Sequence, residues 1–464
     1  MTELLNRART DALDTLAERI EGDVYRPGDD GWDEARMPWN LAVDQLPAAV
    51  VVAESAADVA EAVRAARAEG LRVAPQGTGH SAAALGDLSD TILLRTTRLR
   101  GVEVDPRHRR ARVESGVVWQ EVTDAAAEHG LAALAGSSHD VGVLGYSLGG
   151  GVSWLARKHG LAANTVLAAE IVDADGRIRR IDSEHDPELF WAIRGGGGSF
   201  AIVTALELRL FPVAEVVAGV LFFPIERADE VLSTWLEWTE TVPEEVTSCG
   251  RIMRFPDFPQ VPEPLRGKAF SLVEAVFLTD AATADAALEP LRALGPVMDT
   301  VRVMPARELS TLHMDPPGPV PGVGDGILLG EADVGTVAAL VESAGADSGS
   351  SLLSVEIRHL GGALARTSLG DGAANFVDAA YGVFAVGIAA TPELHAASER
   401  DSKRVVARLA PWDSGRDYMN FRESRASGAR LFSPEIHRRL REIKRRVDPR
   451  DVIRANHPVR PAAG

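Results

Sequence analysis

The sequence predicts an α+β protein with more than one structural part. Its 464 residues exceed the size of one ordinary hydrophobic core. The first half places glycine-rich loops between short apolar runs. From about residue 214, apolar runs such as VVAGVLFFPI, KAFSLVEAVFL and YGVFAVGIAA alternate with long polar helical segments. This second pattern is typical of an antiparallel sheet with helices on one face.

The elements of the N-terminal half follow from local signals. Residues 55–69 predict a helix, because Ser55 and Asp58 form a capping box and Gly70 ends the apolar face. The run LRVAP predicts a buried strand, the glycine loop follows it, and DTILLRTT predicts the next strand. Further on, ARVESGVVWQEVTDAAAEHG predicts a strand and then a helix ending at Gly130, and VLAAEIVDADG predicts another strand.

The C-terminal run SPEIHRRLREIKRRVDP predicts a helix with Ser433 as its N-cap and Pro434 in its first turn. Its arginines could form a surface for phosphate groups. However, an apolar stripe runs along the helix and leaves the arginines on the solvent face, so we interpret it as a solvated helix. The stripe consists of Ile436, Leu440, Ile443 and Val447.

Composition excludes several classes of function. A formal charge of -18 disfavours nucleic acid as a partner. The charged opening segment MTELLNRARTDALDTLAERIEG lacks the apolar stretch of a secretory signal, and no run approaches the roughly 18 apolar residues of a membrane span. Cys249 is the single cysteine, which excludes an internal disulfide and a zinc site of paired cysteines. We expect a cytoplasmic protein without a metal site, and nothing in the sequence indicates its oligomeric state.

The loop GTGHSA matches a dinucleotide fingerprint in the spacing of Gly77, Gly79 and Ala82. A Rossmann loop opens directly into a helix, whereas this loop continues into another strand, and no acidic residue ends a second strand about 20 positions later. A tight turn is the simplest interpretation of one such loop. Two further glycine-rich stretches, GVLGYSLGGGVS and RGGGGSFAIVT, favour a large ligand whose phosphates meet loop amides at several points.

Four blocks, in order, resemble the berberine bridge enzyme branch of the vanillyl-alcohol oxidase superfamily of FAD enzymes. They are RVAPQGTGHS, then GVLGYSLGGGVSWLARKHGLAANTV, then ELFWAIRGGGGSFAIVT, and finally YMNF with IKRRVDPRDVIRANH. The resemblance covers residues 40–459 and is weakest between 215 and 410. It implies a PCMH-type FAD-binding domain of two subdomains over residues 1–213, with its core at 44–213. It also implies a substrate domain over 214–409 and a C-terminal segment, 410–464, that returns to the FAD domain.

The resemblance implies that His80 bonds covalently to the flavin; the alternative is a loop histidine exposed to solvent. An imidazole nitrogen is nucleophilic near neutral pH, and the bond would make the flavin a stronger oxidant. Many relatives attach the flavin a second time through a cysteine, but Ser138 stands at that position here. We therefore expect a single attachment, as in the 6-hydroxynicotine oxidases. Tyr146 also departs from the histidine that is common in doubly linked members.

The other cofactor contacts are assigned by the same resemblance. The loop around the pyrophosphate would comprise Pro75, Gln76, Gly77, Thr78, Gly79, His80 and Ser81. The flavin and its ribityl chain would meet Gly136, Ser137, Val141, Gly142, Gly145 and Tyr146. The ribityl, phosphate and adenine parts would meet Gly149, Gly150, Ser153, Gly160, Leu161 and Val203. Ala201 replaces a glycine that is usual in relatives, and several of these glycines could be purely structural.

Tyr418 and Asn420 match a Tyr-x-Asn motif whose tyrosine often acts as the catalytic base in the family, with the asparagine near the flavin. The alternative for Tyr418 is a packed aromatic residue at a sheet edge. His313, Arg358 and His359 are candidates for substrate contact, although such groups are more often structural or on the surface.

The resemblance implies an oxidase that passes a hydride from a small molecule to FAD and then reduces oxygen to hydrogen peroxide. Valine at position 141 would leave room for oxygen beside the flavin. The alternatives are a flavin dehydrogenase with another electron acceptor and a flavoprotein without catalytic activity. Alcohols, sugars and amines all remain possible substrates.

Overall fold

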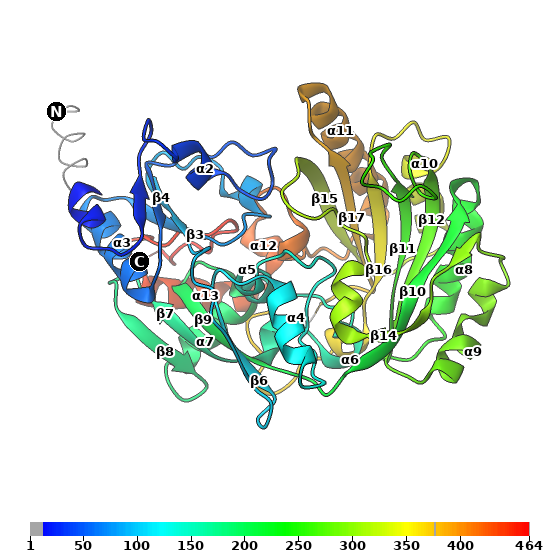
Figure 1. The fold of residues 1–464 in the computed structure, drawn as a ribbon, viewed down its shortest axis with the longest axis horizontal. Helices are drawn as coiled ribbons and strands as arrows, with labels where there is room; N and C mark the ends of the chain where they lie inside the picture. The colour runs from blue at the N-terminus through cyan, green and yellow to red at the C-terminus, as the bar shows by residue number, and fades with distance from the viewer. Residues whose placement is uncertain (1–12, 375–376, 464) are drawn as a thin grey trace.

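The computed structural model describes residues 13–374 and 377–463, which form two halves side by side (Figure 1). The first 12 residues of the charged opening segment lie outside the described chain. One half holds the N-terminal elements together with the C-terminal segment. The other half is built around one large sheet. The predicted division between residues 213 and 214 falls between β9 and β10.

The first sheet of the N-terminal half has four strands in the order β1-β2-β4-β3. They are β1 (Asp23–Tyr25), β2 (Ala49–Val52), β3 (Arg72–Gln76) and β4 (Thr91–Arg95). The three strands β2, β4 and β3 are parallel, and β1 is antiparallel to β2. Helix α3 (Ala56–Ala68) packs its apolar face on this sheet and is capped by the Ser55 hydroxyl, as predicted.

The second sheet has five antiparallel strands in the order β5-β6-β9-β7-β8. They are β5 (Val102–Asp105), β6 (Arg110–Glu114), β7 (Val166–Val172), β8 (Ile178–Asp182) and β9 (Ile202–Arg209). Helices α2 (Trp32–Arg36), α4 (Trp119–Ala127), α5 (Val143–Leu148), α6 (Ala156–His159) and α7 (Pro187–Gly196) complete this half, with 3-10 turns at Ala82–Leu85 and Ala162–Thr165. The helix predicted to end at Gly130 ends earlier, at Ala127, and Gly130 lies in the loop that follows.

The large sheet has eight strands and is antiparallel throughout, which confirms the pattern predicted from residue 214 onward. Its order is β13-β10-β12-β11-β16-β17-β15, with β14 paired to β10. The strands are β10 (Glu215–Pro224), β11 (Val246–Arg254), β12 (Ala269–Phe277), β13 (Met298–Asp299), β14 (Arg302–Pro305), β15 (Gly322–Leu329), β16 (Ser354–His359) and β17 (Tyr381–Ile388).

One face of this sheet is covered by helices, and the other meets the N-terminal half. The covering helices are α8 (Ala228–Thr239), α9 (Ala281–Arg292), α10 (Val334–Ala344) and α11 (Pro392–Leu409). Short 3-10 turns connect the elements at Ile225–Arg227, Ala306–Thr311, Gly362–Ala365 and Ala410–Trp412. Residues at alternate positions along β16 therefore face either the helices or the N-terminal half.

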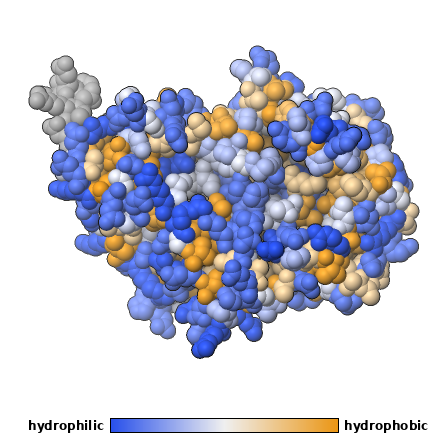
Figure 2. All heavy atoms as spheres, in the orientation of Figure 1, coloured by the Kyte–Doolittle hydropathy of each residue, from blue (hydrophilic) through white to orange (hydrophobic). Residues whose placement is uncertain are grey.

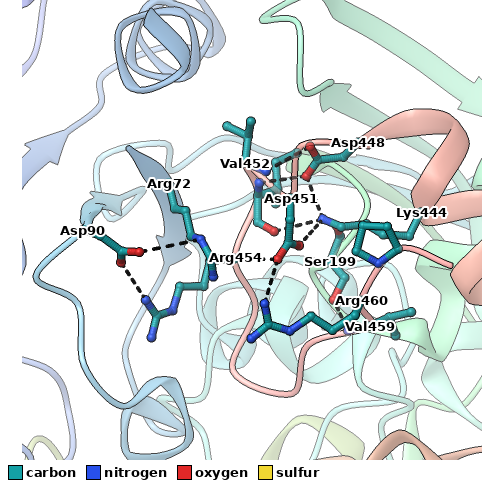
Figure 3. A network of polar contacts seen from close by, with 12 residues as sticks. Arg72, Asp90, Ser199, Lys444, Asp448, Asp451, Val452, Arg454, Val459 and Arg460 are labelled. Atoms are coloured by element: carbon teal, nitrogen blue, oxygen red, sulfur yellow. Dashed lines mark hydrogen bonds and ion pairs between the residues drawn. The ribbon is translucent and has the colours of Figure 1, made fainter. Parts of the chain in front are cut away.

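The C-terminal segment, predicted over residues 410–464, runs beside elements of the N-terminal half. It contains a 3-10 turn (Met419–Phe421), α12 (Gly428–Leu431) and α13 (Pro434–Val447), which is capped by Ser433. After α13, the chain runs beside β3, where the Val73 amide donates to the Val452 carbonyl at 2.8 Å. The exposed arginines of α13 fit the prediction of a solvated helix, but Lys444 is fully buried and binds Asp448 at 2.6 Å (Figure 3).

The surface carries mixed polarity. On the face shown in Figure 2, hydrophilic residues dominate, and apolar residues form separate groups over both halves. Among residues 13–374 and 377–463, no helix combines the length and apolar character needed to cross a bilayer.

Candidate cofactor and active site

His80 lies in a partly buried position with a different group on each side of its ring. The Trp39 indole stacks on the imidazole with ring centroids 3.9 Å apart. The Thr78 hydroxyl lies 2.8 Å from Nδ1, and an Asp140 carboxylate oxygen lies 3.6 Å from Nε2. Nε2 is buried and has no hydrogen-bond partner among the described residues. The imidazole is therefore held in place while one nitrogen remains free to react or to bind.

Asp140 is the charged group of this cluster. It accepts hydrogen bonds from the Trp39 indole at 2.7 Å, the Ser138 hydroxyl at 3.1 Å and the Gly318 amide at 3.2 Å. Burial alone would raise the pKa of the Asp140 carboxyl, but His80, Trp39 and Ser138 together hold it well below its usual range. Asp140 is therefore a carboxylate at neutral pH and faces His80 as an anion.

Two loops near His80 present backbone amides without partners. The amides of residues 77–81 and of residues 136–140 donate no hydrogen bond to any described residue. The loops lie against each other, because a Cβ on Gly142 would stand 3.7 Å from the Thr78 side chain. Gly79 has φ +90°, a left-handed conformation that favours glycine. Consecutive amides of this kind form a concave binding site for anionic oxygens.

Tyr146 connects these loops to the predicted Tyr-x-Asn motif. A Cβ on Gly136 would lie 2.9 Å from the Tyr146 ring. On the other side, the Asn420 amide donates to the Tyr146 carbonyl at 3.0 Å and to the Tyr418 hydroxyl at 3.1 Å. The structure thus brings Tyr418 and Asn420 to the glycine-rich segment, across 274 residues of sequence between Tyr146 and Asn420.

The Tyr418 hydroxyl accepts a second hydrogen bond, from the Val152 amide at 3.0 Å. Burial is the largest influence on its ionisation and raises the pKa of Tyr418 to about 12. The Val152 amide, the Asn420 amide and the positive charge of Arg358 act in the opposite direction. These groups would stabilise the Tyr418 phenolate as it forms. A tyrosine that acts as a general base requires such stabilisation.

A cavity of about 700 Å³, including its open mouth, borders Tyr418. Gly149, Gly150 and Leu161 line it beside Tyr418, and Phe432 and Ile436 from the C-terminal segment lie opposite. Three residues predicted to contact the cofactor, Gly149, Gly150 and Leu161, therefore line the same cavity as Tyr418, the predicted base.

Other predicted cofactor residues occupy more closed positions. Pro75 and Gln76 end β3, and the Gln76 side-chain amide exchanges two hydrogen bonds of 3.0 Å with Gln45. Ser81 precedes the 3-10 turn at Ala82–Leu85, and the Val141 carbonyl accepts from the Trp119 amide. Ser153 and Val203 are buried, Gly145 lies within α5, and Gly160 follows α6.

In the third glycine-rich stretch, RGGGGSFAIVT, three glycines lie against neighbouring segments at distances too short for a side chain. A Cβ on Gly195 would stand 2.1 Å from Ala374, and one on Gly196 would stand 3.1 Å from Leu440 of α13. One on Gly197 would meet Met419 at 3.1 Å. This loop therefore accommodates the close approach of Ala374 and of the C-terminal segment, and its Gly195 also lines the cavity that borders Tyr418.

The three predicted substrate residues are divided between the two faces of the large sheet. Arg358 faces the N-terminal half and donates to the Ser137 hydroxyl at 3.0 Å. His313 is buried on the same side between Glu274 and Glu356, with 2.6 Å contacts to each. His359 lies on the helix-covered side against Tyr381 and Arg157, where burial lowers its pKa to about 3. Only Arg358 reaches a loop predicted to hold the cofactor.

Comparison with known families identifies the fold. Residues 47–182 match the FAD binding domain, and residues 417–460 match the family described as berberine and berberine like. The chain therefore carries an FAD binding domain followed by a berberine-like segment. Both amide loops and His80 fall within the FAD-binding match, and Tyr418 and Asn420 fall within the second match. The unpaired amides and the free His80 Nε2 suit a ligand with many acceptor oxygens, as FAD has.

Curated relatives of this chain include (R)-6-hydroxynicotine oxidase of Paenarthrobacter nicotinovorans, 35% identical over 43% of this chain and 44% of its own length. Glucooligosaccharide oxidase of Sarocladium strictum is 32% identical over 45% of this chain and 42% of its length. The alignments with these relatives thus span less than half of each relative.

Solved structures extend the likeness over nearly the whole chain. The 6-hydroxy-D-nicotine oxidase of Arthrobacter nicotinovorans has a TM-score of 0.82 at 24% identity, covering 96% of this chain and 98% of the other. The Physcomitrella patens BBE-like 1 protein has a TM-score of 0.85 at 19% identity, covering 97% and 100%. At these identities the likeness establishes the fold, and it confirms the predicted PCMH-type α+β architecture.

Several residues of the site were not predicted from the sequence. Trp39 and Asp140 surround His80, and Glu274 and Glu356 hold His313 and Arg358. Asp140 stands two residues from Ser138, so an acidic residue in a block otherwise rich in small residues was a usable signal. Trp39 lies outside every motif, and only the fold places it beside His80.

Proposed function

We propose that the protein is an FAD-dependent oxidase that oxidises a small molecule. The observation that carries this proposal is the contact between Arg358 of the large sheet and Ser137 of an amide loop, with Tyr418 nearby. The two halves thereby form one site, with a cofactor side and a substrate side. FAD supplies a hydride acceptor in such a site.

The residues of this chain would bind and orient the reactants. The amide loops would hold the pyrophosphate, and Tyr418 would take the hydroxyl or amine proton of the substrate. Its two hydrogen-bond donors, Val152 and Asn420, strengthen their interaction as negative charge develops on the phenol oxygen. The large sheet would cover one side of the site, where Arg358 meets Ser137.

The electron acceptor separates two versions of this function. The grass pollen protein Phl p 4 has the same fold at 21% identity, and its wild-type form is described as a glucose dehydrogenase. A variant of it with valine in place of isoleucine is described as a glucose oxidase. Related folds therefore serve both acceptors, and we favour oxygen because the two curated relatives described above are named oxidases.

Flavin reduction tests the function and the role of Tyr418 together. Anaerobic mixing with a panel of alcohols, sugars and amines should bleach the flavin, and admitted oxygen should restore it and yield peroxide. Tyr418→Phe should keep the flavin spectrum and slow reduction about a hundredfold or more, the usual scale for loss of a general base.

The matched control is Tyr381→Phe, which removes a buried hydroxyl bonded to Thr239 on the opposite face of the sheet. It should reduce the flavin at the wild-type rate. Unchanged reduction in Tyr418→Phe would make Tyr418 a packing residue. Rapid bleaching followed by slow recovery in oxygen would identify a dehydrogenase.

We also propose that His80 carries the flavin through one covalent bond. Acid precipitation should leave flavin in the wild-type pellet, and one peptide, containing His80, should have the added mass of FAD. His80→Ala should fold and release its flavin into the supernatant, while His139→Ala, on the neighbouring loop, should keep it. Flavin released entirely from the wild type would contradict the bond.

A further inference from the structure

Five charged side chains form a continuous buried row on the sheet face that meets the cofactor half. Arg251 contacts Glu274 at 3.2 Å, and Glu274 contacts His313 at 2.6 Å. His313 contacts Glu356 at 2.6 Å, and Glu356 contacts the Arg358 Nε at 2.7 Å. The side chains are between 0% and 13% exposed, so solvent screens these contacts little.

The row alternates in charge and has a cation at each end. Burial and Arg251 would lower the pKa of His313, but Glu274 and Glu356 raise it to about 9, so His313 is protonated at neutral pH. Burial would raise the pKa of Glu356, but Arg358 and His313 hold it low. Three cations therefore share two carboxylates.

The two ends of the row differ in their nearby carboxylates. Asp315 is close enough to raise the pKa of Arg251 and of His313, so a third carboxylate lies near the Arg251 end of the row. Among the groups that raise the pKa of Arg358, the carboxylates are Glu356 and Glu274, both already shared within the row.

Arg358 has one guanidinium nitrogen without a hydrogen-bond acceptor among the described residues. Its Nε and one terminal nitrogen bind Glu356 and Ser137, while the other terminal nitrogen donates to no described residue. The guanidinium carbon lies 5.8 Å from the Trp154 ring centroid and 5.4 Å from that of Phe421. Phe421 in turn meets the Tyr418 ring at 5.0 Å. The guanidinium group that carries this nitrogen therefore lies among aromatic rings beside the proposed base.

We propose that Arg358 binds the anionic oxygen of a flat organic substrate, a carboxylate or a phenolate, whose ring rests against Trp154 and Phe421. This inference rests on the proposed function, because it assigns the substrate class of the same site. A guanidinium held on two sides is preorganised for an oxyanion, and its side chain loses little further entropy on binding. A neutral sugar or an amine cation would give this guanidinium nitrogen no anionic partner.

The test compares benzoate with benzamide, which has the same ring and no charge. Both are titrated into purified holoprotein, with binding read by calorimetry and by the change in flavin absorbance. Benzoate should bind at least tenfold more tightly. Arg358→Gln should abolish this preference, and Arg358→Lys should keep part of it. Arg366→Gln, an exposed arginine paired with Glu244, should leave it intact.

The inference is wrong if benzamide binds as well as benzoate, if neither binds, or if Arg358→Gln keeps the preference. A purely structural role for Arg358 would weaken both probes equally. Failure of the proposed function would appear separately, because the flavin content and the reduction of flavin by the substrate panel are measured on the same samples. Flavin reduced by neutral substrates, without a preference for benzoate, would overturn this inference alone.

Discussion

Buried histidines in this protein are charged or neutral according to the groups that meet their two ring nitrogens. His313 lies between two carboxylates, which raise its pKa to about 9 against the effect of burial. No acid among the described residues acts on His359, and burial together with Arg157 lowers its pKa to about 3. The first is a cation at neutral pH and the second is neutral. On one face of the sheet a charged His313 forms ion pairs, and on the other face a neutral His359 packs against an aromatic ring.

This difference predicts how stability depends on pH. The folded pKa of His313, about 9, exceeds its ordinary value of 6.5, so its contribution to stability is fully present below about pH 6.5. The contribution falls as the pH rises through 9, by up to about 3 kcal/mol. Denaturant midpoints from pH 6 to 10 should therefore fall more steeply for the wild type than for His313→Gln.

The control for this experiment is His185→Gln, which alters an exposed histidine paired with Asp182. Its midpoints should follow those of the wild type, because solvent screens an exposed pair. Parallel pH profiles for the wild type and His313→Gln would show that His313 does not titrate as a buried cation.

At the scale of elements, the sequence predicted correctly those features that depend on residues close together in the chain. The caps at Ser55 and Ser433 and the strands around them are confirmed, because capping and apolar period act over a few residues. Which face of β16 meets the cofactor half depends on the partners of the sheet, so Arg358 and His359 were grouped together although they face opposite ways. Lys444 was likewise missed, since its burial depends on a loop beyond the helix.

The turn after α5 depends on the absence of a side chain at Gly149. A Cβ there would stand 1.9 Å from the Asn420 side-chain oxygen and 2.9 Å from its Cγ. Asn420 is fixed by its bonds to Tyr146 and Tyr418, so it cannot move without breaking them. Gly149→Ala should therefore lower the denaturant midpoint by the equivalent of about 1–3 kcal/mol.

Gly145, one turn earlier in the same helix, provides the matched control. A Cβ on Gly145 meets no atom within 4 Å. Gly145→Ala should be neutral or stabilising by up to about 1 kcal/mol, because alanine favours the helix. A drop of the same size in both variants would refute the steric explanation. Loss of bound flavin from Gly145→Ala alone would show that the cofactor lies against its backbone.

At the scale of the whole molecule, the site depends on a chain that leaves the N-terminal half and returns to it. The large sheet supplies Arg358, and the returning segment supplies Tyr418 and Asn420. The resemblance predicted this return, but the local sequence could not, because the partners lie hundreds of residues apart. The contact between Asn420 and Tyr146 is one example, and the bond between Lys444 and the Ser199 carbonyl, at 2.7 Å, is another.

Lys444 fastens the returning segment, and its loss should be costly. Its ammonium is fully buried and binds Asp448 at 2.6 Å, Asp451 at 3.2 Å and the carbonyls of Ser199 and Ile453 (Figure 3). Lys444→Met would leave the buried Asp448 carboxylate without its cation, which costs about 3–5 kcal/mol. The denaturant midpoint should fall accordingly, and the segment beside β3 should become sensitive to protease.

Two further variants separate the buried charge from the shape of the side chain. Lys403→Met removes a lysine from a similar pair on α11, with Glu399, that is exposed to solvent. It should change stability by less than about 1 kcal/mol. Adding Asp448→Asn to Lys444→Met should restore part of the lost stability, because the amide carries no charge to leave unpaired. If Lys444→Met is no worse than Lys403→Met, the buried pair does not fasten the segment, and the packing of α13 against α7 must hold the returning chain instead.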